Sequence, residues 1–423
     1  MGDYLSVHSG WLIAIFTVAY LMIIFEHMIG INKATSALLM AVSCWSVQFA
    51  DRAVHGFNVA HFTEDLADVS QVVLFLLGAI TIVETIHAHG GFSLVSNAIR
   101  ISSKRTCLWI IGFIAFFLSA ILDNLTTTIV LVVMLKKFIE DPKERLLFGA
   151  AVVIAANAGG AWTPIGDVTT TMLWLGGQVS TIPVVQQLFV PSLVCLVVSL
   201  IPLSFSVKGV MNRRTVEGHD ALQPNGKLVF ICGILSLVFV PVFKVLTGLP
   251  PFMGILFSMS FIWLLTDILH RKYDDRDHLR FSAILPRIDL SSIFFFLGIL
   301  LSVNALEAAG ILKNFALWVD QTVASKTVIA SLIGVASAVI DNVPLVAACM
   351  GMYDLQTFPM NHSFWILIAF CAGTGGSLLI IGSAAGVAFM GLEKADFFWY
   401  LRKATIPAAL GYAAGIGTYL FFA

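Results

Sequence analysis

Charged residues are scarce in this sequence, because Asp, Glu, Lys and Arg make up only 12% of its 423 residues. A soluble domain carries about 25% charged residues, and no soluble core of this size could bury the 58% of residues that are hydrophobic. The formal net charge is −1, which provides no bulk electrostatic attraction for nucleic acid. We therefore expect a protein whose apolar surplus faces a lipid bilayer and which has no nucleic-acid partner.

Motifs of cysteine chemistry and of hydrolytic catalysis are also missing. The six Cys residues all lie in apolar stretches without a C-x-x-C pair, so we interpret them as small buried hydrophobic residues. Neither H-E-x-x-H nor G-x-S-x-G occurs, which argues against an intramembrane enzyme. The sequence predicts no catalytic residue and no cofactor.

Long apolar runs dominate what is present, and runs of roughly 17–25 residues can cross a bilayer as helices. Candidate spans lie near 9–29, 33–50, 71–89, 185–206, 227–247, 250–269, 289–308 and 401–421. Two longer runs, 106–138 and 326–354, have polar residues at their centres, and two others, 146–177 and 363–392, are broken by Gly-rich polar stretches. The expected fold class is an all-α polytopic membrane protein.

Three sequence blocks recur in the same order in the two halves of the chain, which indicates an internal repeat. The pairs are LFLLGAITIVETIHAHGG (74–91) with FFFLGILLSVNALEAAGI (294–311), FFLSAILDNLTTTIVL (116–131) with IGVASAVIDNVPLVAA (333–348), and NAGGAWTPIGDVTT (157–170) with GTGGSLLIIGSAAG (373–386). Their offsets are 220, 218 and 216 residues. We infer a first membrane repeat over 1–210, a cytoplasmic linker over 211–226 and a second membrane repeat over 227–423.

Basic residues indicate the topology. If the D-N runs 106–138 and 326–354 are re-entrant hairpins, 20 of the 24 Lys and Arg residues share one side of the membrane. If these runs crossed the membrane instead, this asymmetry would be lost. We therefore interpret both runs as re-entrant hairpins, which leaves ten spans, five in each half, with both termini outside. Because five is odd, the second repeat is predicted to be inverted, as in many secondary transporters.

Polar residues at the centres of the four interrupted runs are the candidate site. A carboxylate within a membrane costs at least about 2.5–3.5 kcal/mol, so it needs a functional or structural reason. The candidate cation- and proton-binding residues, where Na⁺ would bind, are Asp123, Asn124, Asn157, Asp167, Asp341 and Asn342, and the supporting residues are Ser119, Thr126, Thr127, Thr163, Thr169, Ser337, Thr374, Ser377 and Ser383. Their carboxylate, amide and hydroxyl oxygens suit a hard cation. The alternatives are helix caps at the hairpin tips and kinks with packing glycines at the breaks.

Glu84 lies well inside the third predicted span, and its repeat partner is Asn304. It is a candidate for a proton path. A carboxyl group hydrogen-bonded between helices is an equally good interpretation.

At DNLTTT (123–128), NAGGAWTPIGD (157–167) and the second D-N (341–342), the sequence resembles the NhaD-type Na⁺/H⁺ antiporters. These belong to an ion transporter superfamily that includes dicarboxylate and arsenite carriers. The likeness runs from about residue 50 to the C-terminus. It implies ten or more spans with re-entrant hairpins, and export of Na⁺ or Li⁺ driven by inward H⁺. It also implies that the six candidate cation- and proton-binding residues form the ion site.

We therefore expect a secondary antiporter that exchanges Na⁺ (or Li⁺) for H⁺ by alternating access and so serves pH homeostasis. Cations and protons would compete for Asp123, Asp167 and Asp341, because repulsion and desolvation disfavour three ionised carboxylates in one site. A Na⁺-coupled carboxylate or arsenite carrier on the same scaffold is the alternative. We expect a multi-pass protein of a bacterial inner (cell) membrane, although an organellar membrane also fits, and a homodimer would anchor the scaffold helices.

Overall fold

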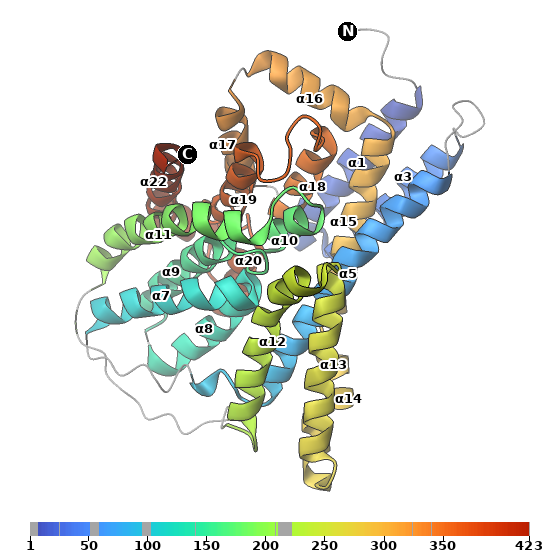
Figure 1. Ribbon diagram of the computed structural model, residues 1–423. Coiled ribbons are helices and arrows are strands. Elements are labelled where there is room, and N and C mark those ends of the chain that lie inside the picture. Colours follow the sequence, from blue (N-terminus) through green and yellow to red (C-terminus); the bar gives the residue numbers. More distant parts are fainter. Residues whose placement is uncertain are drawn as a thin grey trace.

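The computed structural model describes residues 7–24, 26–50, 59–94, 103–139, 141–207, 209, 222–323, 325–339 and 341–422. Every regular element within these ranges is a helix (Figure 1). Seven of the described helices are long and apolar enough to cross a membrane: Phe62–Ala88, Lys104–Leu122, Thr181–Ser206, Gly226–Thr247, Pro251–His270, Leu290–Ala308 and Thr405–Phe422. The predicted fold class, an all-α polytopic membrane protein, is confirmed. Residues 211–221 of the predicted linker lie outside the described residues.

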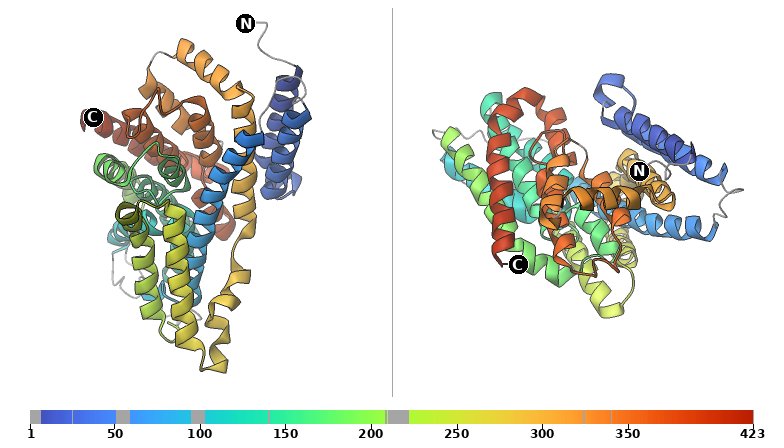
Figure 2. Two further views of the ribbon diagram at one scale, coloured as in Figure 1. Left: turned by 45° about the vertical axis from the view of Figure 1, so that its right-hand side comes forward. Right: turned by 90° about the horizontal axis from the view of Figure 1, so that it is seen from above.

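Six helices form a flanking group, which occupies the right and lower part of Figure 1. They are α1 (Val7–Ile24), α3 (Lys33–Ala50), α5 (Val59–Ala88), α12 (Gly226–Thr247), α13 (Pro251–His270) and α15 (Leu290–Ala308). α5 packs against α12, α13 and α15, while α3 packs between α1 and α15. Figure 2 shows α5, α12 and α13 running side by side.

A central group contains the four interrupted runs. It consists of α7 (Lys104–Leu122), α8 (Asn124–Phe138), α9 (Pro142–Ala161), α10 (Val168–Leu175), α11 (Thr181–Ser206), α17 (Lys326–Ala336), α18 (Asn342–Met352), α19 (Ser363–Gly375), α20 (Ala384–Glu393), α21 (Phe397–Lys403) and α22 (Thr405–Phe422). α9 and α19 pack against each other at its centre, and every residue over 148–161 and 364–375 is buried. The two breaks that carry candidate site residues therefore each follow a helix whose last residues are all buried.

Short elements complete the described chain: α2 (Glu26–Ile29), η1 (Asp274–Leu279), α14 (Phe281–Ile284), η2 (Leu285–Arg287) and α16 (Ile311–Thr322). The sequence does not predict α16, which packs against α15 and α18 and lies across the top of Figure 1.

The helix interruptions occur where the sequence predicts them. The run 106–138 is two helices that meet at Asp123, and the run 326–354 is two helices that flank residues 337–341. Residues 162–167 separate α9 from α10, and residues 376–383 separate α19 from α20. The re-entrant course of the first two runs and the inversion of the second half stay predictions.

Local chemistry starts and ends these helices. The Asp141 side chain accepts a hydrogen bond from the Lys143 N–H at 3.0 Å, and Pro142 occupies the first turn of α9, where a missing N–H has no cost. α12 ends at Gly248, whose φ of +72° suits glycine, and α13 starts at Pro251. The short connection between them keeps α12 and α13 packed together.

One hydrogen bond is made at corresponding positions in the two halves. The Ser119 hydroxyl donates to the Ala156 carbonyl at 2.7 Å, and the Ser337 hydroxyl donates to the Ala372 carbonyl at 3.2 Å. In each half the bond ties the first helix of a D-N run to the helix that precedes a break. The shared serine of S-A-x-x-D-N thus makes the same contact twice.

Two glycines permit the close approach that this hydrogen bond requires. A Cβ atom on Gly159 would lie 2.1 Å from the Phe116 carbonyl oxygen, and one on Gly375 would lie 1.9 Å from the Gly334 carbonyl oxygen. Both contacts are with backbone, which cannot rotate away as a side chain can. Only glycine fits at either position.

We expect Gly159→Ala to destabilise the central group by about 1–3 kcal/mol or more, since overpacking against backbone forces the helices apart. Gly417→Ala in α22 is the matched control, because no atom lies within 4 Å of its added Cβ. The measurement is the melting temperature of each purified variant in detergent. Equal melting temperatures for the two variants would contradict the packing role of Gly159.

Candidate ion-binding site

A buried network of side-chain hydrogen bonds joins three of the four interrupted runs. The Asn124 amide nitrogen donates to Asn157 Oδ1 at 3.0 Å and to Asp167 Oδ2 at 2.9 Å. The Asn157 amide nitrogen donates to the hydroxyl oxygens of Ser377 at 3.1 Å and Ser383 at 2.9 Å. All five side chains are at most 5% exposed. The structure therefore brings the first D-N tip together with both breaks.

Asp167 is the most extensively hydrogen-bonded carboxylate of the network. Its Oδ1 accepts from the Thr169 N–H and from the Thr169 hydroxyl, each at 2.9 Å, and its Oδ2 accepts from Asn124. Asp167 thereby caps α10. Three donors therefore surround a carboxylate that is only 1% exposed.

Asp123 occupies a strained backbone position at the tip between α7 and α8. Its φ of 113° and ψ of 161° fall in a region that essentially only glycine populates. The side chain caps α8 by accepting from the Thr126 N–H at 2.7 Å and from the Thr126 hydroxyl at 2.9 Å. Such strain costs about 1–3 kcal/mol and clusters at functional sites.

The second D-N tip is not equivalent to the first. Asp341 has an ordinary backbone conformation, with φ of −47° and ψ of 135°, and among the described residues its side chain accepts from the Val343 N–H at 3.3 Å. Asn342 is 4% exposed, and its amide nitrogen has no hydrogen-bond partner within the described residues. Asp341 lies close enough to Asp167 for electrostatic interaction. The structure thus brings Asp341 near the network without a direct hydrogen bond to it.

The predicted supporting hydroxyls have two kinds of partner, and one group of them donates to backbone carbonyls. The donors and their acceptor carbonyls are Ser119 to Ala156, Thr163 to Ala120, Ser337 to Ala372 and Thr374 to Phe370. Thr127 is fully buried, and its hydroxyl has no hydrogen-bond partner among the described residues. The four donors named first therefore bind backbone carbonyls, while Thr126, Thr169, Ser377 and Ser383 hydrogen-bond other side chains of the site.

The sequence reasoning missed three hydroxyls that satisfy the unwound backbone. The Tyr400 hydroxyl donates to the Ser377 carbonyl at 2.9 Å, and the Thr405 hydroxyl donates to the Leu378 carbonyl at 2.7 Å. In the first break, the Thr171 hydroxyl donates to the Pro164 carbonyl at 2.8 Å. Tyr400 and Thr405 lie outside the four interrupted runs, and no pattern in the sequence singles out any of the three residues.

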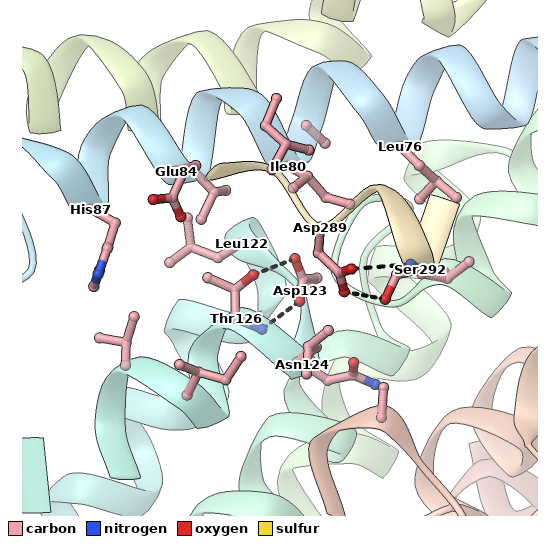
Figure 3. A pocket seen from close by; sticks show the side chains of 18 of the residues that line it. Leu76, Ile80, Glu84, His87, Leu122, Asp123, Asn124, Thr126, Asp289 and Ser292 are labelled. Atoms are coloured by element: carbon pink, nitrogen blue, oxygen red, sulfur yellow. Dashed lines mark hydrogen bonds between the residues drawn. The ribbon is translucent and has the colours of Figure 1, made fainter. Parts of the chain in front are cut away.

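A cavity of about 220 Å³ reaches the first tip from the flanking group (Figure 3). Asp123, Asn124 and Thr126 line it on one side, and Glu84 and His87 of α5 line it on another. The structure therefore places Glu84 in the same cavity as Asp123. Four further polar residues that the sequence reasoning did not select also line the cavity: Thr171, Arg287, Asp289 and Ser292.

A second cavity, of about 320 Å³, lies between α5, α10, α15 and α18. Asp65, Asp68, Asn304 and Glu307 contribute its polar lining, so the repeat partner of Glu84 lies here. None of the candidate site residues lines it within the described part of the chain. The site thus communicates with the first cavity and not with the second in this conformation.

Comparison with known proteins identifies similar transporters. The family described as citrate transporter, CitMHS, matches residues 20–362. Sodium/proton antiporter 1 of Arabidopsis thaliana is 54% identical over 409 residues, which cover 96% of this chain and 71% of the relative. Sodium/proton antiporter 2 of the same plant is 53% identical over 413 residues, with coverage of 96% and 98%. The Na⁺/H⁺ antiporter NhaD of Alkalimonas amylolytica is 31% identical over 442 residues, with coverage of 97% and 89%.

The strain at Asp123 predicts that glycine is tolerated there better than alanine. We expect Asp123→Gly to be more stable than Asp123→Ala by about 1–3 kcal/mol, since only glycine adopts this backbone conformation without cost. Melting temperatures of the purified variants provide the measurement. The control pair is Asp341→Gly and Asp341→Ala, where the ordinary φ should make alanine at least as stable as glycine. An alanine variant as stable as the glycine variant at position 123 would disprove the strain.

Proposed function

The chain belongs to the NhaD-type ion transporters, within the family described as citrate transporter. From this premise we propose that it is a secondary antiporter that exchanges Na⁺ or Li⁺ for H⁺. One observation carries the proposal beyond the names of its relatives. Asp167 is a carboxylate that is only 1% exposed, and it accepts a hydrogen bond from Asn124. Asn124 belongs to the first D-N tip, which also carries the carboxylate of Asp123. Oxygen ligands around a buried negative charge suit a hard cation without its water shell.

The mechanism is competition between Na⁺ and H⁺ for the same carboxylates. Asp123, Asp167 and Asp341 cannot all stay ionised in a partly dry site without a cation, since repulsion and desolvation both disfavour it. Na⁺ binding displaces protons, and proton binding displaces Na⁺. Exposure of the loaded site to one face and then to the other converts this competition into exchange. The contact of the site with only one of the two cavities supports such alternating access.

Anion transport, which the description of the family suggests, fits the site less well. Citrate and other carboxylates require helix N-termini, hydroxyls, amides or basic residues. The first D-N tip and the first break instead contribute Asp123 and Asp167, and these carboxylates would repel an anion. A Na⁺-coupled carboxylate carrier on the same scaffold is therefore the alternative that the experiments below distinguish.

The location of the protein is a further part of the proposal. A bacterial inner membrane is supported by the NhaD relative from Alkalimonas amylolytica, while the relatives with more than half of their residues identical come from a plant. Localisation of a fluorescently tagged chain in its source cells distinguishes the cell membrane from an organellar membrane.

A homodimer held by the flanking group would give the central group a fixed body to move against. Cross-linking of the protein in membranes tests whether this dimer forms.

Competition predicts a defined effect of pH. Lowering the pH on the side where Na⁺ binds protonates the shared carboxylates, so the apparent KM for Na⁺ should rise, by up to about tenfold per pH unit for one competing proton. The maximal rate should not change, because saturating Na⁺ displaces the proton. Initial rates of Na⁺-dependent dissipation of a pH gradient in proteoliposomes measure both quantities. A KM independent of pH would show that the two ions use separate sites.

The aspartates themselves are tested by substitution. We expect Asp123→Asn, Asp167→Asn and Asp341→Ala each to abolish exchange of Na⁺ and Li⁺ while membrane insertion is retained. The assay includes K⁺ and succinate as comparison substrates, and Asp354→Asn, outside the site, is the control that should keep full activity. Exchange retained in all three site variants would reject this assignment. Na⁺-dependent succinate uptake without a cation/proton response would favour the carboxylate carrier.

A further inference from the structure

Asp289 lies at the N-terminus of α15, at the edge of the first cavity. Figure 3 shows it beside Asp123, and both residues line the same cavity of about 220 Å³. Asp289 belongs to the flanking group, whereas Asp123 belongs to the central group. Two carboxylates from different parts of the molecule therefore face one water-accessible space.

Helix capping accounts for the position of Asp289. Its Oδ1 accepts from the Ser292 N–H at 3.3 Å, and its Oδ2 accepts from the Ser292 hydroxyl. The helix dipole also favours a negative charge at this position. The place of Asp289 at the edge of the cavity allows the same charge a second role.

The other charges around the cavity indicate what that role is. Glu84, Asp123 and Asp289 line the cavity, and none of them forms an ion pair within the described residues. Arg287 and His87 line the same cavity and lie close enough to Glu84 for electrostatic interaction. A cleft with low-dielectric walls and a surplus of one charge raises the local concentration of counter-ions. Three carboxylates and one arginine line the cavity, and this surplus of negative charge attracts cations toward Asp123.

We propose that Asp289 sets the apparent Na⁺ affinity of the Asp123 site on the side of the membrane where this cavity opens, through the electrostatic field of its carboxylate. The inference rests on the proposed function. Asp289 is exposed, so its field acts through solvent and is screened by salt. Because Asp289 and Asp123 lie in different helix groups, their proximity belongs to the conformation in which this cavity reaches the site. The effect is therefore confined to one side.

The test compares the apparent KM for Na⁺ in everted and in right-side-out membrane vesicles. Asp289→Ser removes the charge and keeps a capping hydroxyl. We expect its KM to rise by about threefold or more on one side only, with an unchanged maximal rate. The rise should shrink when choline chloride brings the ionic strength to about 0.15 M, where the Debye length is about 8 Å.

Two control variants separate the field of Asp289 from other effects. Ser292→Ala removes the hydroxyl that Asp289 binds but leaves the charge, and Asp275→Asn removes a charge that is 79% exposed outside the cavity. Both should keep the wild-type KM. An equal rise on both sides, a rise undiminished by salt, or the same rise in Ser292→Ala would overturn the proposal. An unchanged KM in Asp289→Ser beside an active wild type would refute only the role of Asp289, whereas an inactive wild type would refute the proposed function.

Discussion

The two hydrogen bonds donated by Asn124 are the contacts on which the site depends. They reach Asn157 before the first break and Asp167 after it, at 3.0 and 2.9 Å. One amide group thus fixes the first D-N tip against both arms of the break, and Asn157 extends the connection to the second break. A buried polar group that loses its partner costs about 1–3 kcal/mol. Loss of the Asn124 amide would therefore leave Asn157 and Asp167 each without one hydrogen-bond donor.

The same constraint explains the composition around the site. Non-helical backbone deep in a membrane protein is stable only where its polar groups find partners inside the protein. Serine, threonine and tyrosine hydroxyls supply those partners, as Tyr400 and Thr405 do for the second break. Gly159 and Gly375 let the helices come close enough for the hydroxyls to reach. The hydroxyls can reach these carbonyls only because the glycines allow the helices to pack closely.

The two halves differ in the residues that would bind the transported ion. The two D-N tips share a motif, yet Asp123 is strained and lines a cavity, while Asp341 is relaxed and lines neither of the two cavities described above. The first break carries Asp167, and the corresponding position of the second break is Ser383. The repeat therefore provides a symmetric frame, and the charges concentrate on its first half. A cation site suits this distribution, and an anion site does not.

The sequence by itself determined the helical membrane class, the four interruptions and the polar residues at each of them. These features follow from local physics, because a long apolar run predicts a membrane helix, and a carboxylate within such a run is costly enough to be informative. Only the tertiary structure decided that Asn124 reaches Asp167, that Tyr400 satisfies a carbonyl of the second break and that Asp289 faces the cavity of Asp123. Residues far apart in the chain meet in each case, and such distances depend on how the helices pack. Periodicity along one helix contains no information about that packing.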